Sequence, residues 1–174
     1  GHVAWILNNR DIKEAKLSQK QAVQRASKFL EEKGYKNMVS TYMVKYGNAV
    51  LINYAYQQDD VIMYPDLIKV KVALDNGEIV GFDAIQFLTN NYERPIEKPL
   101  LTPEQAQEKI SPQAKLKGEP RLCYIPTDSL REIYCYEFQV TYKGDLFLIY
   151  INADTGEEEK ILKLIQNENG TLTI

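Results

Sequence analysis

The chain has 174 residues, of which 44% are hydrophobic and 26% are charged, and its formal net charge is −3. This composition is typical of a globular protein, and so small a net charge argues against nucleic acid as the main ligand. No apolar run approaches the roughly 20 residues of a membrane-spanning helix. His2 is the only histidine, which excludes Ser–His and Cys–His nucleophilic pairs.

The first half of the chain predicts a strand, a helix and an antiparallel sheet. Residues 2–7 predict a short strand and residues 8–16 a polar linker. Apolar side chains recur at helical spacing over 18–33, where Ser18 is a good N-cap and Gly34 is expected to end the helix. The strands expected next span 38–46, 49–57, 61–64, 67–74 and 78–82, with a break at Pro65-Asp66. A short helix over 83–91 should then direct Ile85 and Leu88 inward.

The second half predicts the same order of elements. A linker over 92–100 contains two prolines and leads to a helix over 103–110, with Thr102 as N-cap and Pro103 at the first helical position. The expected strands span 114–125, 132–142, 145–152, 157–166 and 171–174. The first of these can break near Gly118, and Asn169-Gly170 favours a hairpin before the last.

Two matching turns indicate an internal repeat. Asp75-Asn76-Gly77-Glu78 and Asp154-Thr155-Gly156-Glu157 each follow an apolar strand, and each lies downstream of a similar helix opening, Leu17-Ser18 or Leu101-Thr102. The fold class is therefore predicted to be α+β, with two tandem repeats, each a helix packed on an antiparallel sheet of about four strands. The expected boundaries are 11–97 and 98–174, with 1–10 as a leftover strand and linker of a preceding repeat. The alternative for 1–10 is an expression-tag remnant followed by a short apolar leader.

Residues suited to catalysis do not gather in the sequence. The paired acids Asp59-Asp60 and the run Glu157–Glu159 are predicted to be solvated, and the Asp-x-Gly-Glu turns lack the remaining ligands of a calcium loop. No catalytic, cofactor-binding or metal-binding residue is therefore assigned. Cys123 and Cys135 stand symmetrically about Ser129, so a hairpin would place them opposite each other, either as a disulfide or as two half-buried thiols.

Two features suggest an interaction surface instead. Nine basic residues against four acidic ones lie between Arg10 and Lys45, and the final stretch from Asp154 is acidic. The candidate interaction patch consists of Arg10, Lys13, Lys16, Lys20, Lys28 and Lys36. The alternative is the ordinary solvated face of an amphipathic helix. Twelve tyrosines could form a sheet surface for a protein or glycan, or could be structural.

Several stretches carry a resemblance to a known family. They are Trp5–Arg10, Gly34–Met38, Met63–Asp66, Ile125–Glu132 and Ile151–Glu158. Together with the capped helix and the Asp-x-Gly-Glu hairpin, they make the chain similar to PepSY domains, and more closely to the C-terminal PepSY repeats of the YpeB family of spore germination proteins. The resemblance covers essentially the whole chain.

The resemblance implies tandem PepSY repeats behind an N-terminal membrane anchor that lies outside this fragment, on the outer side of the spore inner membrane. It implies a non-catalytic role in the accumulation and stability of the cortex-lytic enzyme SleB. Related PepSY units in propeptides of secreted metalloproteases imply enzyme inhibition or chaperoning. The expected function is thus to bind, stabilise or restrain SleB, without cofactor, nucleic acid or membrane contact by the fragment itself. The alternatives are a peptidoglycan-binding module and a protease-inhibitor or propeptide-like module.

Overall fold

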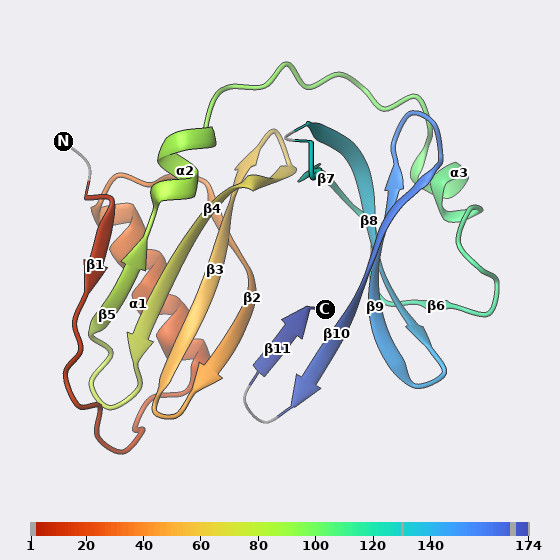
Figure 1. Ribbon diagram of the computed structural model, residues 1–174. Helices are drawn as coiled ribbons and strands as arrows, with labels where there is room; N and C mark the ends of the chain where they lie inside the picture. The colour runs from red at the N-terminus through yellow and green to blue at the C-terminus, as the bar shows by residue number, and fades with distance from the viewer. Residues whose placement is uncertain (1–2, 130, 168–169, 174) are drawn as a thin grey trace. The chain divides into compact units, whose positions relative to one another are not determined.

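The computed structural model describes residues 3–129, 131–167 and 170–173 (Figure 1). The elements in chain order are β1 (Trp5–Leu7), α1 (Gln19–Glu32), β2 (Met38–Tyr46), β3 (Ala49–Gln58), β4 (Val61–Ala73), β5 (Ile79–Asp83), α2 (Ile85–Asn90), α3 (Pro103–Gln107), β6 (Lys115–Leu116), β7 (Arg121–Pro126), β8 (Glu132–Tyr142), β9 (Asp145–Asn152), β10 (Glu158–Asn167) and β11 (Gly170–Thr173). The α+β fold class predicted from the sequence is confirmed.

The chain divides into two compact units. The first comprises Gly1–Gln57, Pro65–Tyr92 and Asn167–Thr171, and the second comprises Gln58–Tyr64, Glu93–Gln166 and Leu172–Ile174. The strand order in the first unit is β1-β5-β4-β3-β2, and in the second β10-β9-β8-β6, with β7 paired to β8. Residue 169 of the predicted Asn169-Gly170 hairpin lies outside the described residues.

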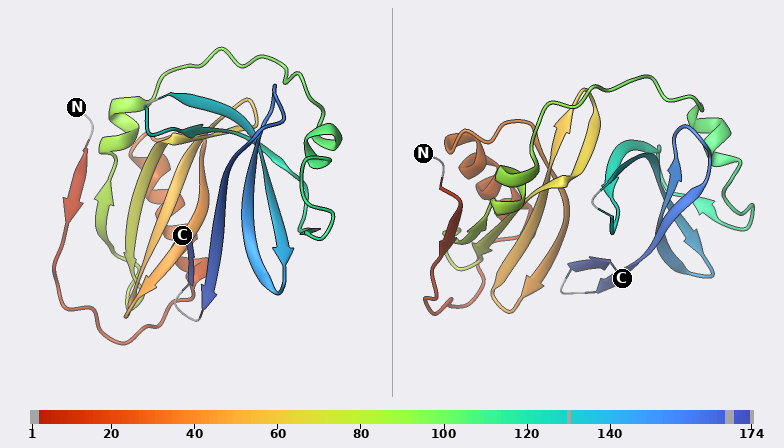
Figure 2. Two further views of the ribbon diagram at one scale, coloured as in Figure 1. Left: turned by 45° about the vertical axis from the view of Figure 1, so that its right-hand side comes forward. Right: turned by 45° about the horizontal axis from the view of Figure 1, so that its top comes forward.

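Helix α1 begins where the sequence predicts. The backbone N–H of Gln21 donates to Ser18 Oγ at 3.3 Å, and the Ser18 N–H donates to Gln21 Oε1 at 2.9 Å, which completes a capping box. Gly34 follows the helix with a φ of +86°, a conformation that glycine adopts without steric cost. The helix lies against one face of the sheet (Figure 2). Its small and apolar stripe of Ala22, Ala26 and Leu30 is buried in the core of this unit.

Alternate residues of the first sheet form the core under α1. They are Val50, Ile52 and Tyr54 of β3, Ile68, Val70 and Val72 of β4, and Phe82 of β5. The ring of Phe82 meets the ring of Phe29 edge to face at a centroid distance of 5.3 Å. This alternation explains why the strand pattern was readable from the sequence, because successive side chains of a strand point to opposite faces.

Two sequence predictions in the first unit are wrong. Strand β4 runs unbroken through Pro65 and Asp66. Pro65 lies between the residues that pair with β7, Ile62–Met63, and those that pair with β5, Lys69–Val72, so its missing N–H interrupts neither ladder.

The second error concerns the face of α2. Ile85 and Leu88 are 55% and 42% exposed, whereas the ring of Phe87 packs on Tyr35 at a centroid distance of 5.3 Å. The reason is that β5 extends through Asp83, so the helix starts two residues later than expected and presents a different face to the core.

Strand β1 adds to the outer side of β5 in antiparallel register. Trp5 pairs with Asp83, Ile6 with Phe82 and Leu7 with Gly81. Ile6 packs against the core of the first unit, whereas Trp5 and Leu7 are more than half exposed. The segment predicted to be a leftover strand therefore completes the sheet of the first unit.

In the second unit, β8 and β9 form a hairpin whose turn, Lys143-Gly144, has positive φ at both residues. Their inward residues pack against Ala106 of α3. Helix α3 has the predicted Thr102 capping box and Pro103 at its start, but it ends at Gln107 rather than at residue 110. The N–H of Lys109 and that of Ile110 reach carbonyls three residues back, which tightens the last turn. The predicted break near Gly118 separates β6 from β7.

The β7–β8 hairpin has the register expected from the cysteine positions. Cys123 lies opposite Cys135, and both are fully buried free thiols. Strand β7 also pairs in parallel with the start of β4, which the prediction of purely antiparallel sheets did not include.

The two repeated turns are alike in their backbone hydrogen bonds. In the first, the Gly77 N–H donates to the Ala73 carbonyl at 2.9 Å and the Leu17 N–H to the Leu74 carbonyl at 2.9 Å. In the second, the Gly156 N–H donates to the Asn152 carbonyl and the Leu101 N–H to the Ala153 carbonyl, both at 3.0 Å. Each turn thus holds the entry to its helix in the same way.

Candidate functional site

The candidate interaction patch does not form one compact cluster. Lys13, Lys16, Lys20, Lys28 and Lys36 are exposed, but they are distributed along the segment before α1, along the helix and beyond its end. A helix of this length spans roughly 20 Å, so Lys16 and Lys36 lie at opposite ends of it. Lys28 pairs with Glu32 one turn away at 3.8 Å, with both side chains largely exposed, which is a weak interaction.

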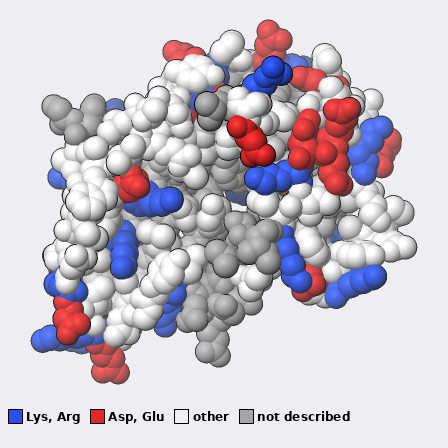
Figure 3. All heavy atoms as spheres, in the orientation of Figure 1, with Lys and Arg blue, Asp and Glu red and all other residues white. Residues whose placement is uncertain are grey.

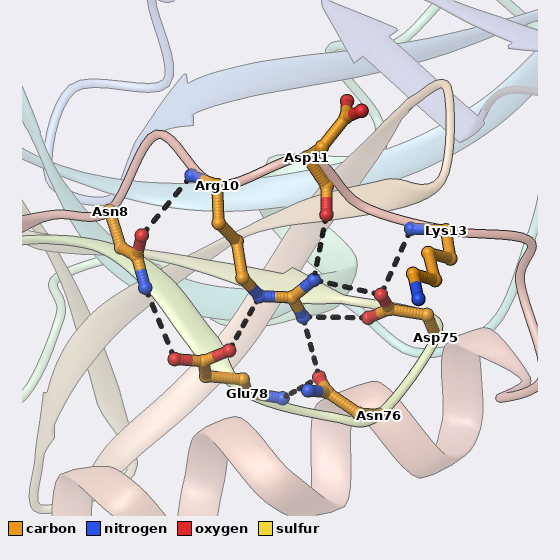
Figure 4. A network of polar contacts seen from close by, with 7 residues as sticks. All are labelled: Asn8, Arg10, Asp11, Lys13, Asp75, Asn76 and Glu78. Carbon is orange, nitrogen blue, oxygen red and sulfur yellow. Dashed lines mark hydrogen bonds and ion pairs between the residues drawn. The ribbon is translucent and has the colours of Figure 1, made fainter.

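Arg10, the remaining member of the patch, binds the repeated turn of its own unit (Figure 4). Its Nη1 and Nη2 donate to the two carboxylate oxygens of Asp75 at 2.8 and 2.7 Å, and its Nε donates to Glu78 at 2.6 Å. Two further bonds reach Asn76 Oδ1 at 2.8 Å and the Asp11 carbonyl at 3.1 Å. All five guanidinium N–H groups are therefore used.

Neighbouring groups complete this network, which we call the Arg10 clamp: Asn8, Arg10, Asp11, Lys13, Asp75, Asn76 and Glu78. Asn8 Nδ2 donates to Glu78 at 3.1 Å, and the Lys13 N–H donates to Asp75 at 2.9 Å. The hydrogen bonds from Arg10 hold the pKa of Asp75 well below its ordinary value. The clamp fixes the segment between β1 and α1 onto the turn, and Arg10 has no N–H left for a partner.

A second network, which the sequence analysis missed, surrounds a buried carboxylate in the second unit. The side chain of Glu137 is 2% exposed and accepts hydrogen bonds from Tyr64, from Tyr150 at 2.9 Å and from Arg121 at 2.5 Å. Burial, together with the nearby Glu137 charge, raises the pKa of both tyrosines, which therefore remain protonated donors. We call these four residues the Glu137 network.

A signal for this network was present in the sequence. The register that places Cys123 opposite Cys135 also places Arg121 opposite Glu137, so an ion pair across the hairpin follows from the same symmetry. The two tyrosines come from other strands, and only the assembled sheet brings them to the carboxylate.

The chemistry of the Glu137 network is that of a structural anchor. Its carboxylate already accepts from three donors, and burial raises the pKa of the adjacent Cys123 thiol, which opposes formation of a reactive thiolate. Burial likewise raises the pKa of Cys135 to about 12. Among the residues that the structure describes, no group of three or more His, Cys, Asp or Glu side chains could hold a metal ion.

The linker before α3 is anchored by a third arginine. Arg94 is 3% exposed and makes two bonds of 2.7 Å to the carboxylate of Glu132. Its backbone exchanges two hydrogen bonds with the side chain of Gln58. Arg94 precedes Leu101 by as many residues as Arg10 precedes Leu17. Arg10 binds Asp75 in the repeated turn of its unit, whereas Arg94 binds Glu132, which lies outside the repeated turn of the second unit.

Four of the twelve tyrosines are likewise buried in the interior: Tyr35, Tyr54, Tyr136 and Tyr150. Tyr54 is 1% exposed and its hydroxyl lies 3.0 Å from Ser27 Oγ, and the hydroxyl of Tyr136 donates to the Leu101 carbonyl at 2.9 Å. Tyr46 and Tyr92 are more than half exposed. The structural alternative therefore accounts for the buried tyrosines, while a tyrosine surface for a partner stays a prediction.

The charges that face solvent differ between regions of the chain. Figure 3 shows acidic side chains gathered over the turn from β9 to β10 and the start of β10, where Asp154, Glu157 and Glu158 are exposed. Within the described residues, no helix is long and apolar enough to cross a membrane.

Comparison with known proteins agrees with this architecture of capped helices and duplicated turns. The family described as "YpeB sporulation, PepSY1 and PepSY2 domains" matches residues 1–97, and the one described as "Peptidase propeptide and YPEB domain" matches residues 100–162. The fold and its repeated turn are thus those of a PepSY-repeat protein. More specifically, the chain belongs to the YpeB sporulation family.

Its relatives show how much of such a protein the chain represents. It is 38% identical to sporulation protein YpeB of Halalkalibacterium halodurans and 37% identical to that of Bacillus subtilis, over 97% and 94% of this chain. In both cases it spans 37% of the relative's length. The solved Bacillus megaterium YpeB C-terminal domain superposes with a TM-score of 0.87 at 39% identity, over 96% of this chain and 74% of that one.

Proposed function

We propose that this chain is a non-catalytic interaction module that acts in spore germination by binding SleB, a cortex-lytic enzyme, and stabilising or restraining it. Membership in the YpeB sporulation family is the observation that carries the proposal. The chemistry of the described side chains supports it. The buried carboxylate of Glu137 accepts from its own chain, and the raised pKa values of the two cysteines oppose a nucleophilic thiolate.

The proposed location is extracytoplasmic, in the region of the spore inner membrane and cortex. An interaction surface there must remain accessible when the module is folded. The exposed lysines before, along and beyond α1 meet this condition, and they are the first side chains to test: Lys13, Lys16, Lys20, Lys28 and Lys36.

The test is co-purification of this chain with purified SleB, followed by biolayer interferometry at two salt concentrations. A variant combining Lys20→Glu and Lys28→Glu should weaken binding at least about tenfold if the surface contributes, because it replaces attraction by repulsion. The matched control combines Lys117→Glu and Lys160→Glu, which alters two exposed lysines outside the patch by the same charge. Absence of SleB binding by the wild-type chain and by the full-length protein would contradict the proposal.

The sign of regulation requires a separate measurement. If the module stabilises SleB, it should slow proteolysis of the enzyme without lowering its lytic rate on purified cortex. If it restrains SleB, the lytic rate should fall as the module is added, and the fall should saturate at concentrations set by the dissociation constant of the complex. Either result supports an interaction role, and a change in neither would contradict it.

The exposed lysines also favour a second candidate function, binding of peptidoglycan, whose acidic groups would attract them. Retention of the chain on purified cortex at low salt, with loss of retention in the Lys20→Glu, Lys28→Glu variant, would support it. A propeptide-like inhibitor is the third possibility. It predicts inhibition of a protease, and a panel of secreted metalloproteases would detect that.

A further inference from the structure

The two repeats bear the same acidic turn, but only one of them holds an arginine. Asp75 and Glu78 of the first turn occupy the positions of Asp154 and Glu157 in the second. The residue after the aspartate also plays the same part in both turns. Asn76 Oδ1 accepts from the Glu78 N–H at 3.0 Å, and Thr155 Oγ1 accepts from the Glu157 N–H at 3.2 Å.

The surroundings of the two turns correspond as well. A Cβ placed on Gly77 would meet Leu17 Cδ1 at 3.0 Å and Arg25 Cγ at 3.4 Å, and one placed on Gly156 would meet Leu101 Cδ1 at 3.1 Å and Lys109 Cε at 3.0 Å. The first carboxylate of each turn also accepts a backbone N–H from the segment before the helix. Asp75 accepts from Lys13, four residues before Leu17, at 2.9 Å, and Asp154 accepts from Leu100, directly before Leu101, at 3.0 Å, so the two donors occupy different positions.

The difference lies in the guanidinium. In the first turn Arg10 binds both carboxylates, whereas in the second unit the residue at the equivalent offset, Arg94, binds Glu132. Among the described residues, the Asp154 carboxylate has the Leu100 N–H as its hydrogen-bond donor and forms no ion pair within 4.0 Å. Asp154 and Glu157 are both exposed.

We propose that the turn Asp154–Glu157 is a docking site for an arginine side chain presented by a protein partner, and that the partner's arginine binds there as Arg10 binds in the first repeat. The first repeat supplies the independent evidence, since a guanidinium binds the corresponding pair of carboxylates, Asp75 and Glu78, in the same chain. Bidentate binding by a carboxylate suits the planar fork of arginine and not the single ammonium of lysine.

The hollow next to Asp154 gives room for the rest of the partner's segment. Pro95, Leu100 and Tyr134 line it beside Asp154, together with charged residues that include Glu97, Lys98 and Glu132. The ring of Tyr134 stacks on that of Tyr124 at a centroid distance of 4.8 Å. Leu100 is 78% exposed. The apolar and aromatic part of this lining can accommodate the methylene stem of an arginine and the residues flanking it.

This inference rests on the proposed function only in assuming a protein partner. Its test uses a peptide instead of SleB, so the two can fail separately. The probe is the chain's own clamp segment, residues 8–13, as an acetylated and amidated peptide, titrated into the isotope-labelled chain at low salt and followed by the amide resonances of residues 154–157. The comparison peptide carries Arg10→Lys.

The arginine peptide should produce saturable shifts at residues 154–157, and the lysine peptide should bind at least about fivefold more weakly. Asp154→Asn should weaken binding by about fivefold or more, because it removes the charge while keeping an acceptor for the Leu100 N–H. Asp128→Asn, an exposed aspartate elsewhere in the second unit, is the matched control and should leave binding within about twofold.

A variant of the first repeat makes a negative result informative. Arg10→Ala vacates the carboxylates of Asp75 and Glu78, so the arginine peptide should then also shift the amides of residues 75–78. Binding of the peptide at 75–78 in this variant, with no response at 154–157, would overturn the proposal. Shifts at 154–157 that persist unchanged in Asp154→Asn would overturn it too.

Discussion

The Glu137 network gives a direct test of what holds the second unit together. Tyr150→Phe removes one hydroxyl from a site where Tyr150 is 3% exposed and the side chain of Glu137 is 2% exposed, so water cannot readily replace the lost donor. A hydrogen bond to a charged group contributes about 1.5–3 kcal/mol. Because Tyr64 and Arg121 continue to donate to the carboxylate, we expect the lower part of this range, about 2 kcal/mol.

The assay is urea denaturation followed by far-UV circular dichroism, supported by thermal melting. A loss of this size should lower the melting temperature by about 4–8 °C for a chain of this length. The same substitution made in a Glu137→Gln background should cost only about 1 kcal/mol, since the acceptor is then neutral. Tyr142→Phe is the control, because its hydroxyl makes a 3.4 Å contact with Gln113 and its removal should cost less than about 0.5 kcal/mol. A Tyr150→Phe chain as stable as wild type, or an equal loss in both backgrounds, would refute the reasoning.

Three further predictions follow from the clamp, the turns and the cysteines. Arg10→Ala should lower the free energy of unfolding most above the ordinary aspartate pKa of about 3.9, and progressively less as the pH falls toward and through the lowered pKa of Asp75. The reason is that protonation of Asp75 abolishes the ion pair in the wild type as well. Urea titrations at pH 7 and pH 3 check this, and an equal loss at both pH values would contradict it. Gly34→Ala should lower the free energy of unfolding by about 1 kcal/mol, because only the left-handed backbone conformation opposes it. Gly156→Ala should lower it more, because the new Cβ would also meet Leu101 and Lys109. Equal losses in the two variants would show that these contacts cost nothing. Cys123 and Cys135 should react with iodoacetamide at pH 8 only when urea unfolds the chain, since burial raises the pKa of both thiols, and rapid alkylation of the native protein would show that one is accessible.

Local signals predicted much of the fold. The Ser18 and Thr102 caps, the two Asp-x-Gly-Glu turns and the Lys143-Gly144 hairpin all depend on residues close in sequence, and each is found where it was expected. The β7–β8 register followed from symmetry about a single turn, because a hairpin pairs residues equidistant from its centre.

The features that were missed depend on contacts between distant segments. Pro65 ends a strand only where its missing N–H would have to pair, and that depends on which neighbours lie beside β4. The inward face of α2 depends on where β5 ends. The partners of Arg10, Arg94 and Glu137 are separated from them by as much as 73 residues for Tyr64 and Glu137, and residue type alone does not assign such pairs.

The placement of β1 bears on how these repeats can be exchanged between relatives. A repeat defined from its helix cap onward would begin near Leu17 and would leave behind both Ile6, which packs on the core, and Arg10, which closes the turn. Hybrid proteins joined at that cap should thus lose both the edge strand β1 and the ion pair between Arg10 and Asp75. Joining relatives upstream of Trp5 keeps both with the sheet that they complete.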